Sequence, residues 1–274
     1  MNFLKRIYNF YLDASIHVAL SVYCMVWLTS FTLSVPVDSN LALFLFFGTI
    51  ASYNFVKYGL EAEKYILLAN RYHKNIQFFS FVALVFVVYY AFGLNKETWE
   101  TLIVLSIITG LYAIPVLPHA KNLRSLSGFK IIIVAIVWSG ATVLLPVLQN
   151  GELISWDVVV ESVQRLLMVL ALMLPFEIRD LRYDPPELNT IPQRFGINNT
   201  KLIGVVLVLI IMLLTFLKDN LVNSEIVVKT FICLTLLMAI LNSNKNKSKY
   251  YASFWVEALP ILWLMLTWLT FEGC

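Results

Sequence analysis

The stretch FEIRDLRYDPPELNTIPQRFG, residues 176–196, directly follows an apolar segment long enough to cross a membrane. It brings together Glu177, Asp180 and Asp184 and carries several arginines around them. Charged groups are expensive at membrane depth, so a cluster of them at the end of an apolar segment marks either an interface or a functional site. The first question is therefore what kind of chain surrounds it.

Composition answers that question. Of the 274 residues, 59% are hydrophobic and only 14% are charged. A soluble domain carries roughly a quarter charged residues and slightly under half apolar ones. This imbalance predicts an all-α, polytopic membrane bundle and excludes an ordinary soluble enzyme. It gives no sign of a nucleic-acid partner, whereas membrane lipids are expected to surround the chain.

A helix needs about 20 predominantly apolar residues to cross a bilayer. That length predicts about nine spans, at 16–35, 41–59, 76–94, 99–117, 128–148, 157–176, 201–217, 224–241 and 252–271. Residues 1–15 mix apolar, polar and basic side chains and are predicted to form an interfacial helix. The rest, 16–274, is then a single transmembrane domain.

Lys and Arg residues are distributed unevenly between the connecting segments. Most lie before the first span and after the second, fourth, sixth and eighth, whereas the alternate loops are poor in bases and relatively acidic. Because this bias in short loops sets orientation, we expect the N-terminus in the cytoplasm and the C-terminus outside. The expected location is the cytoplasmic (inner) membrane.

The sixth predicted span contains Glu161, Gln164 and Arg165. Charged groups at this depth need a partner or a polar interior. Glu161 and Arg165 are four residues apart, so they share one helix face and can pair. We favour a local ion pair near the outer interface, with a functional polar contact inside the bundle as the alternative.

The acidic cluster follows the sixth span, on the predicted cytoplasmic side. If the helix continues that far, Glu177, Asp180 and Asp184 fall within a sector of roughly 60°. Carboxylates at this spacing suit Mg²⁺, which binds a few of them together with phosphate oxygens and water, and arginines add bidentate donors for phosphate. Pro185 and Pro186 are expected to end the helix. The alternative is an ordinary charged cytoplasmic loop.

The residue pattern of this stretch resembles the second aspartate-rich motif of the UbiA superfamily of membrane prenyltransferases. In that motif a DxxxD element is followed by a threonine, a proline and a final glycine before the next span. The element here runs from Asp180 to Asp184, and Thr190, Pro192 and Gly196 follow it. The family is a bundle of nine helical spans, which agrees with the number of apolar segments in this chain.

A second resemblance covers residues 111–142, LYAIPVLPHAKNLRSLSGFKIIIVAIVWSGAT. The family segment has a Tyr and a Pro closing one span, then a basic loop, then a span that contains a Trp. Tyr112, Pro115, Lys121 and Arg124 occupy the corresponding places. Glu257 in the ninth span stands where family members commonly carry an aspartate.

The family's first motif, NDxxDxxxD at the end of the second span, is not preserved. The equivalent segment reads SYNFVKYGLEAEKY. Aligning the Asn of the motif on Asn54 places Phe55, Tyr58 and Ala62 where aspartates are expected, although Glu61 lies nearby. Half of the expected Mg²⁺–diphosphate clamp is therefore missing, and fixed cations would have to replace part of its charge.

The resemblance implies prenyl-diphosphate chemistry with Mg²⁺. It assigns catalysis to Asp180 and Asp184, and metal binding to these two with Glu177 and, as a further candidate, Glu61. Basic or hydrogen-bonding residues expected at the diphosphate are Arg179, Lys121, Arg124, Lys57, Lys64, Asn54 and Tyr112. Aromatic candidates for the lining of an isoprenoid cavity are Phe44, Phe46, Phe47, Tyr53 and Trp138.

Two functions of different classes follow. The first is a prenyltransferase that moves an isoprenoid chain from a prenyl diphosphate to a membrane-embedded acceptor of quinone-precursor or aromatic type; a cyclase of prenyl diphosphates would share the apparatus. The second is a catalytically degenerate protein that binds an isoprenoid lipid or serves as a membrane scaffold subunit. The retained carboxylates favour the first and the lost motif favours the second. A transporter is disfavoured, because the chain lacks paired Gly/Pro-interrupted spans.

Overall fold

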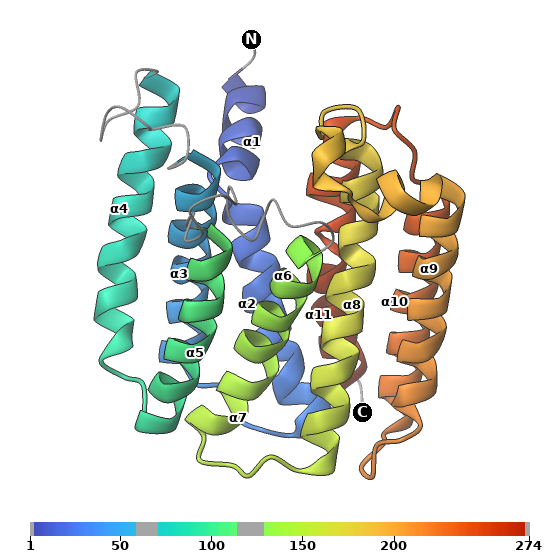
Figure 1. Ribbon diagram of the computed structural model, residues 1–274. Coiled ribbons are helices and arrows are strands. Elements are labelled where there is room, and N and C mark those ends of the chain that lie inside the picture. Colours follow the sequence, from blue (N-terminus) through green and yellow to red (C-terminus); the bar gives the residue numbers. More distant parts are fainter. Residues whose placement is uncertain (1–2, 59–70, 114–128, 272–274) are drawn as a thin grey trace.

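The computed structural model describes residues 3–58, 71–113 and 129–271, and every regular element in these ranges is helical. Most of the helices run up and down one bundle (Figure 1). In chain order the elements are α1 (Phe3–Asp13), α2 (Ile16–Leu33), α3 (Ser39–Tyr58), α4 (Arg71–Ala91), α5 (Lys96–Ala113), α6 (Phe129–Ser139), the π-helix η3 (Gly140–Leu144), α7 (Leu145–Gln149), α8 (Trp156–Asp180), the 3₁₀-helix η4 (Pro186–Leu188), α9 (Ile191–Thr215), α10 (Asn223–Leu241), the π-helix η5 (Tyr251–Val256) and α11 (Leu259–Phe271).

Eight stretches of the described chain are helical, long enough and apolar enough to cross a membrane: Ile16–Leu33, Ser39–Tyr58, Tyr72–Ala91, Lys130–Gln149, Trp156–Asp180, Ile191–Thr215, Asn223–Leu241 and Tyr251–Thr270. The helix α5 (Lys96–Ala113) covers residues 99–113 of the remaining predicted span, 99–117, whose last four residues lie outside the described chain. Its first turns carry Lys96, Glu97 and Glu100, which lower its apolar character. The prediction of an all-α polytopic bundle is therefore confirmed.

The bundle has two ends, which we name from the view in Figure 1. The upper end holds α1, the end of α3 and the end of α8; the lower end holds the C-terminus and the loops at 150–155 and 216–222. α1 stands above α2. The helical conformation is interrupted between them at Ser15, whose φ is 59°. The described charged side chains of residues 176–196 thus lie at the upper end.

The main core surrounds α8. Met168 and Leu172 of α8 pack with Met25 of α2, Leu236 of α10 and Trp263 of α11, and all five are buried. At Gly204, α9 passes so close to its neighbours that an added Cβ would lie 2.8 Å from a side-chain carbon of Ile240 and 3.0 Å from one of Leu174. The helices α2, α8, α9, α10 and α11 therefore form one tightly packed unit.

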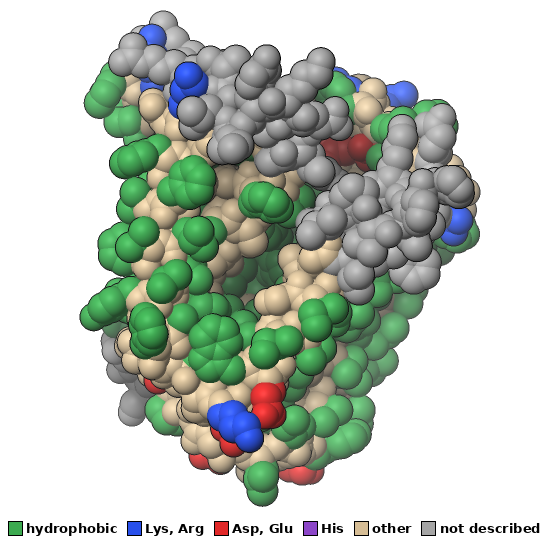
Figure 2. Space-filling model, turned by 60° about the vertical axis from the view of Figure 1, so that its left-hand side comes forward, with side chains coloured by type: hydrophobic (Ala, Val, Ile, Leu, Met, Phe, Trp, Pro, Cys, Tyr) green, Lys and Arg blue, Asp and Glu red, His purple; other side chains and the backbone are tan. Residues whose placement is uncertain are grey.

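The α3–α4 side of the bundle is more open. α4 packs on α3, where the ring of Phe47 stacks on Phe86 with centroids 4.7 Å apart. Outward-facing apolar side chains cover this side, and Figure 2 shows that the surface between them is hollowed. A cavity of about 410 Å³ lies between α3 and α4, and one of about 310 Å³ lies between α3 and α5.

Two predicted boundaries differ from the structure. α8 ends at Asp180, five residues before Pro185, so the prolines do not end it; a turn covers 181–183, and Pro185 is extended with ψ 147°. The following helix begins at Ile191, ten residues earlier than the predicted span, and contains a kink at Gly196, where φ is 78°. Only glycine adopts that conformation readily, so Gly196 joins a short helical segment in the loop to the helix that enters the bundle.

Candidate functional site

The three carboxylates of the opening stretch lie at the upper end of α8. Glu177 is buried, and its Oε2 accepts a hydrogen bond from the backbone N–H of Ile191 at 3.2 Å. That bond joins the end of α8 to the start of α9. Asp184 lies one turn beyond Asp180, because its N–H donates to the carbonyl of Asp180 at 2.9 Å. The turn after α8 thus keeps the two aspartates one helical turn apart, although the helix itself has ended.

Asp180 forms a two-point ion pair with its neighbour. Arg179 Nε donates to Oδ1 at 2.7 Å and Nη2 donates to Oδ2 at 2.9 Å. Both side chains remain partly exposed, at 18% for Arg179 and 28% for Asp180. Arg179 also donates from Nη1 to the carbonyl of Lys249 at 3.2 Å, which places the pair between α8 and the segment that precedes η5.

The positive charge of Lys130, at the start of α6, acts on Glu177 and offsets part of the cost of its burial. Within the described ranges, no group of three acidic, His or Cys side chains converges closely enough to hold a metal ion. Mg²⁺ does not require three, because it is commonly held by one or two carboxylates together with phosphate oxygens and water. Asp180 and Asp184 therefore fit the protein's part of such a site.

Asn54 and Lys57 of α3 take part in a polar junction at the same end of the bundle. Asn54 is buried; its Nδ2 donates to Ser80 Oγ at 2.9 Å and to the carbonyl of Ala14 at 3.1 Å, and its Oδ1 accepts from Ser15 Oγ at 2.7 Å. This amide joins three helices and has no N–H left for a ligand. Lys57 donates to the carbonyl of Asp13 at 3.1 Å and keeps nearly half of its side chain exposed.

Several predicted site residues lie outside the described part of the chain. They are Glu61, Lys64, Lys121 and Arg124, together with the side chain of Tyr112. Their contribution to the site stays a prediction. The described half of the candidate site is consequently the α8 half, on which the charge of Lys130 of α6 acts, whereas Lys57 of α3 contacts Asp13 and Tyr58.

The predicted cavity aromatics are mainly interhelical contacts. Trp138 Nε1 of α6 donates to the hydroxyl of Tyr53 of α3 at 2.9 Å, and Phe46 packs edge-on against Tyr23 of α2. Phe44 lines the cavity between α3 and α5.

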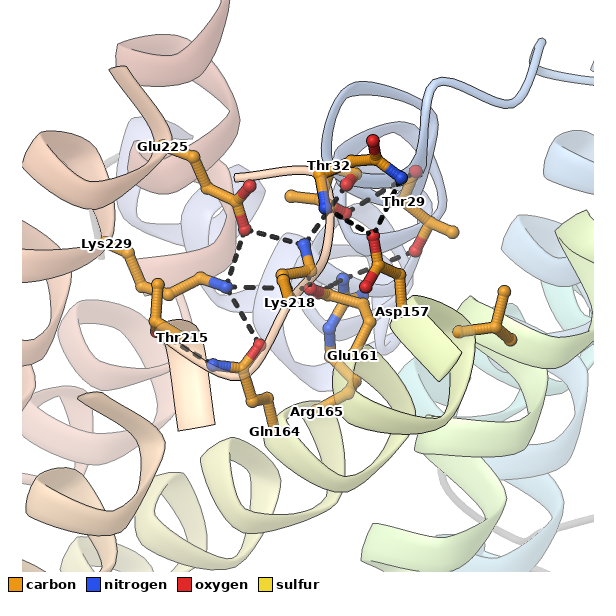
Figure 3. A network of polar contacts seen from close by, with 12 residues as sticks. Thr29, Thr32, Asp157, Glu161, Gln164, Arg165, Thr215, Lys218, Glu225 and Lys229 are labelled. Atoms are coloured by element: carbon orange, nitrogen blue, oxygen red, sulfur yellow. Dashed lines mark hydrogen bonds and ion pairs between the residues drawn. The ribbon is translucent and has the colours of Figure 1, made fainter. Parts of the chain in front are cut away.

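A second charged region lies near the lower end, again on α8 (Figure 3). Glu161 and Arg165 form the predicted ion pair, with Nη2 and Oε1 3.0 Å apart, and both side chains are almost completely buried. The pair is only part of a larger network. Lys218, in the α9–α10 connection, lies 3.2 Å from Glu161 Oε2 and 2.7 Å from Glu225 Oε1.

Lys229 of α10 completes the network. Its Nζ lies 2.9 Å from Glu225 Oε1 and 3.6 Å from Glu161 Oε2, and it donates to Gln164 Oε1 at 3.0 Å. Burial lowers the pKa of Lys218, but the carboxylates of Glu161 and Glu225 outweigh it, so the net pKa is raised and this ammonium stays charged at neutral pH.

Neutral groups occupy most of the remaining hydrogen-bonding capacity. Arg165 Nη1 donates to the carbonyl of Met25 and to Thr142 Oγ1, at 2.8 and 3.1 Å, and Nη2 reaches Thr29 Oγ1 at 3.3 Å. Gln164 donates to Thr215 Oγ1 at 2.8 Å. Within the described residues, the ammonium and amide donors of this network all point at protein acceptors, and Arg165 Nε is the one guanidinium nitrogen that is buried without a hydrogen bond.

Sequence reasoning found the Glu161–Arg165 pair but missed the other half of the network. The charge distribution along the sequence assigns Lys218 and Glu225 only to the connection between the seventh and eighth spans, and it predicts no role for Lys229. The available signal was the spacing of Glu225 and Lys229, four residues apart on α10, which matches the spacing on α8.

Comparison with known proteins places the fold. No protein-family model and no curated protein matches the sequence. Among solved structures, a UbiA homologue from Archaeoglobus fulgidus bound to Cd²⁺ superimposes with a TM-score of 0.62 at 13% identity, covering 94% of this chain and 98% of that one. The same homologue bound to GPP and Mg²⁺ gives a TM-score of 0.61 at 12% identity, with the same coverage.

A structure described as digeranylgeranylglyceryl phosphate synthase gives a TM-score of 0.58 at 12% identity, covering 97% of each chain. The class of protein is therefore a polytopic membrane bundle of the UbiA type. This chain has the UbiA fold along nearly its whole length, as the motif at 176–196 had indicated.

Proposed function

We propose that the protein is an integral membrane prenyltransferase, which moves an isoprenoid chain from a prenyl diphosphate to a hydrophobic acceptor of quinone-precursor or aromatic type. The observation that carries the proposal is the pair Asp180 and Asp184, one turn apart at the upper end of α8. They occur in a fold whose solved neighbours include one bound to GPP and Mg²⁺.

The charged residues at the upper end would divide metal binding and charge stabilisation between them. Asp180 and Asp184, with Glu177 behind them, would hold Mg²⁺ at the diphosphate. When bound, the ion neutralises the charge that develops on the departing diphosphate. Arg179 and Lys57 add fixed positive charge on either side, and such preorganised cations favour the transition state over the ground state.

The upper end is placed on the cytoplasmic side of the inner membrane, with the C-terminus outside. The support is the concentration of Lys and Arg in the connections at that end of the bundle. Soluble anionic diphosphates would then reach the carboxylate cluster from the cytoplasm, and the isoprenoid chain would lie among the helices.

A binding or scaffold function is the second candidate. The observation that favours it is Asn54, the one residue kept from the first motif, whose amide is fully engaged in joining α3 to α4 and to the junction between α1 and α2. A protein that kept the fold and lost catalysis would bind a prenyl diphosphate or an isoprenoid lipid without turning it over.

The two candidates separate in a turnover assay. Purified protein is incubated with Mg²⁺, geranyl diphosphate and a panel of phenolic and quinone-precursor acceptors, and diphosphate release is measured. Acceptor-dependent release that Asp180→Asn and Asp184→Asn abolish supports the enzyme. Binding of geranyl diphosphate without release from any acceptor favours the second candidate.

A further inference from the structure

The membrane-facing sides of α9 and α10 end at the same level of the bundle. Each side is a row of exposed apolar side chains that recur every three or four residues and therefore share one helix face. Lipid tails are as apolar as such side chains, so these faces lie against lipid. At the upper end Lys201 directly precedes the first row and Asn242 directly follows the second. The row on α9 consists of Leu202, Val206, Leu209 and Leu213, and the row on α10 consists of Val227, Phe231, Leu234, Met238 and Leu241.

A hydrogen bond joins the two rows where they end. Lys201 Nζ donates to the carbonyl of Leu241 at 2.7 Å, which leaves the other N–H groups of this ammonium for further acceptors. Aromatic side chains of the kind enriched at the membrane–water interface stand in the neighbouring segments: Tyr183 is 75% exposed and Trp255 is 67% exposed. The headgroup region of the bilayer is therefore expected around Lys201 and Leu241.

Basic residues gather at this level, where α8 ends, α9 begins and α10 ends (Figure 1). Residues 179–201 and 241–250 contain seven Lys and Arg residues but only three Asp and Glu residues. Arg179 is paired with Asp180. No acidic side chain in the ranges that the structure describes forms an ion pair with the other six, so their charge is available to an external anion. We call these six the basic surface, and they are Arg182, Arg194, Lys201, Lys245, Lys247 and Lys249.

The connection that carries three of these lysines, residues 242–250, is held against the end of α8. Arg182 Nη2 donates to the carbonyl of Lys245. Arg179 Nη1 donates to the carbonyl of Lys249 at 3.2 Å. The lysine side chains thus start from fixed backbone positions, and preorganisation of this kind lowers the cost of binding a ligand.

Aromatic rings position two of the ammonium groups. Lys247 Nζ lies 4.9 Å from the centre of the Tyr251 ring, and Lys249 Nζ lies 5.0 Å from the centre of the Tyr250 ring. A ring face attracts a cation but supplies no oxygen acceptor, so the N–H groups still need hydrogen-bond partners. Phosphate oxygens are strong acceptors for such groups, because the hydrogen bond joins opposite charges.

We propose that the basic surface binds the headgroups of anionic phospholipids in the leaflet at the upper end of the bundle. The lipid phosphate lies at the depth at which Lys201 and Leu241 meet, and the acyl chains lie along the apolar rows of α9 and α10. A zwitterionic headgroup brings its own cation and gains less from these bases. A soluble anion would use the bases but not the apolar rows. Such binding is independent of prenyl transfer.

Thermal unfolding in mixed micelles tests the proposal. The purified full-length protein in a neutral detergent receives increasing mole fractions of dioleoyl phosphatidylglycerol or dioleoyl phosphatidylcholine, which share their acyl chains and differ in net charge. A ligand that binds the folded state raises the unfolding midpoint. We expect phosphatidylglycerol to raise the midpoint at mole fractions at which phosphatidylcholine has little effect. Equal effects of the two lipids overturn the proposal, since only the acyl chains would then matter.

A double variant locates the effect. Lys245→Gln/Lys249→Gln removes two exposed bases and leaves the packed core untouched. Each base near an anionic surface strengthens binding about fivefold, so the phosphatidylglycerol needed for half of the full rise should increase roughly 20-fold. Lys5→Gln/Lys96→Gln removes the same charge from exposed positions outside the basic surface and is expected to match the wild type. An equal loss in both double variants contradicts a localised binding surface.

Two further ligands separate the lipid from soluble anions. Glycerol phosphate should not reproduce the rise, and a rise of the same size would assign the surface to soluble phosphates instead. Loss of the response to geranyl diphosphate in Lys245→Gln/Lys249→Gln, with the response to phosphatidylglycerol unchanged, would place these lysines in the diphosphate site and overturn the proposal.

The wild type alone decides if the double variant does not fold. Its specific response to phosphatidylglycerol must shrink when the ionic strength is raised from about 0.05 to about 0.5 M, because salt screens exposed charges. A response that does not change with salt contradicts binding through the basic surface.

Discussion

Both ends of α8 carry charged side chains, but those near Glu161 are buried and paired with one another, whereas those near Glu177 are partly exposed. Glu161 and Glu177 are 16 positions apart, which corresponds to about 24 Å along a helix. Around Glu161 the acids and bases satisfy one another inside the bundle, and none is more than slightly exposed. Around the buried Glu177, the side chains of Asp180 and Asp184 are partly exposed, and Asp180 is paired with Arg179 at the bundle end.

The difference teaches how to read charge in a membrane protein. A buried ion cluster that is fully paired fixes the positions of the helices that contribute to it, whereas an incompletely paired cluster can accept a ligand. By this criterion the lower network is structural, and the upper end is the part of the molecule that the proposed function assigns to the diphosphate. The following changes test that distinction, beginning with the largest expected effect.

Breaking the lower network is expected to cost the most stability. Lys229→Met keeps the length of the side chain and removes its charge, which leaves Glu225 and Glu161 short of a buried partner. Loss of one partner from a buried ion pair costs about 3–5 kcal/mol. Unfolding of the purified protein in detergent, followed by circular dichroism, measures the change; a loss below about 1 kcal/mol contradicts the structural role.

Neutralising the upper carboxylates is expected to affect activity and not stability. Asp180→Asn and Asp184→Asn each remove a negative charge that would hold Mg²⁺, and prenyl transfer should fall on the order of 10²-fold. The midpoint of thermal unfolding without ligand should stay within a few degrees of the wild type, because both residues are partly exposed and lie beyond the packed core around α8. Equal losses of folding and activity would place them in the structural class instead.

A packing change in the tightly packed unit of α2, α8, α9, α10 and α11 is expected to have an intermediate effect on the free energy of unfolding. In Gly204→Ala the new methyl group meets Ile240 at 2.8 Å and Leu174 at 3.0 Å, so α9 must move away from α8 and α10. Overpacking of this kind costs about 1–3 kcal/mol. The same substitution at Gly110, where an added Cβ meets nothing within 4 Å, is the matched control, and it is expected to leave stability unchanged or slightly higher.

The smallest effect is expected for an exposed ion pair. Lys96 and Glu100 lie 3.6 Å apart on α5, with 85% and 66% of their side chains exposed. Glu100→Gln should change the free energy of unfolding by less than about 0.5 kcal/mol, because exposed helical pairs are weak. A change as large as that of Lys229→Met would mean that burial does not separate the two kinds of pair.

The sequence was sufficient for the fold, whereas the roles it assigns to Asp180 and Asp184 stay predictions. Apolar segments of the right length and the residue pattern at 176–196 predicted an all-helical bundle of the UbiA type. Both signals could be recognised because each depends only on residues that are neighbours in the sequence. The end of α8 at Asp180 and the early start of α9 at Ile191 were missed, since the hydrogen bond of Glu177 to Ile191 is a tertiary contact. Lys218 and Lys229 were missed for the same reason: only folding brings them to Glu161.

Ligand-induced stabilisation tests the central claim most directly. The thermal unfolding midpoint of the wild type, of Lys229→Met and of Asp180→Asn/Asp184→Asn is measured with and without geranyl diphosphate and Mg²⁺. A ligand that binds only the folded state raises the midpoint in proportion to its affinity. We predict a clear rise for the wild type and for Lys229→Met, from a lower baseline, and none for the double aspartate variant. A rise of equal size in the double variant would contradict the assignment of the upper end as the diphosphate site.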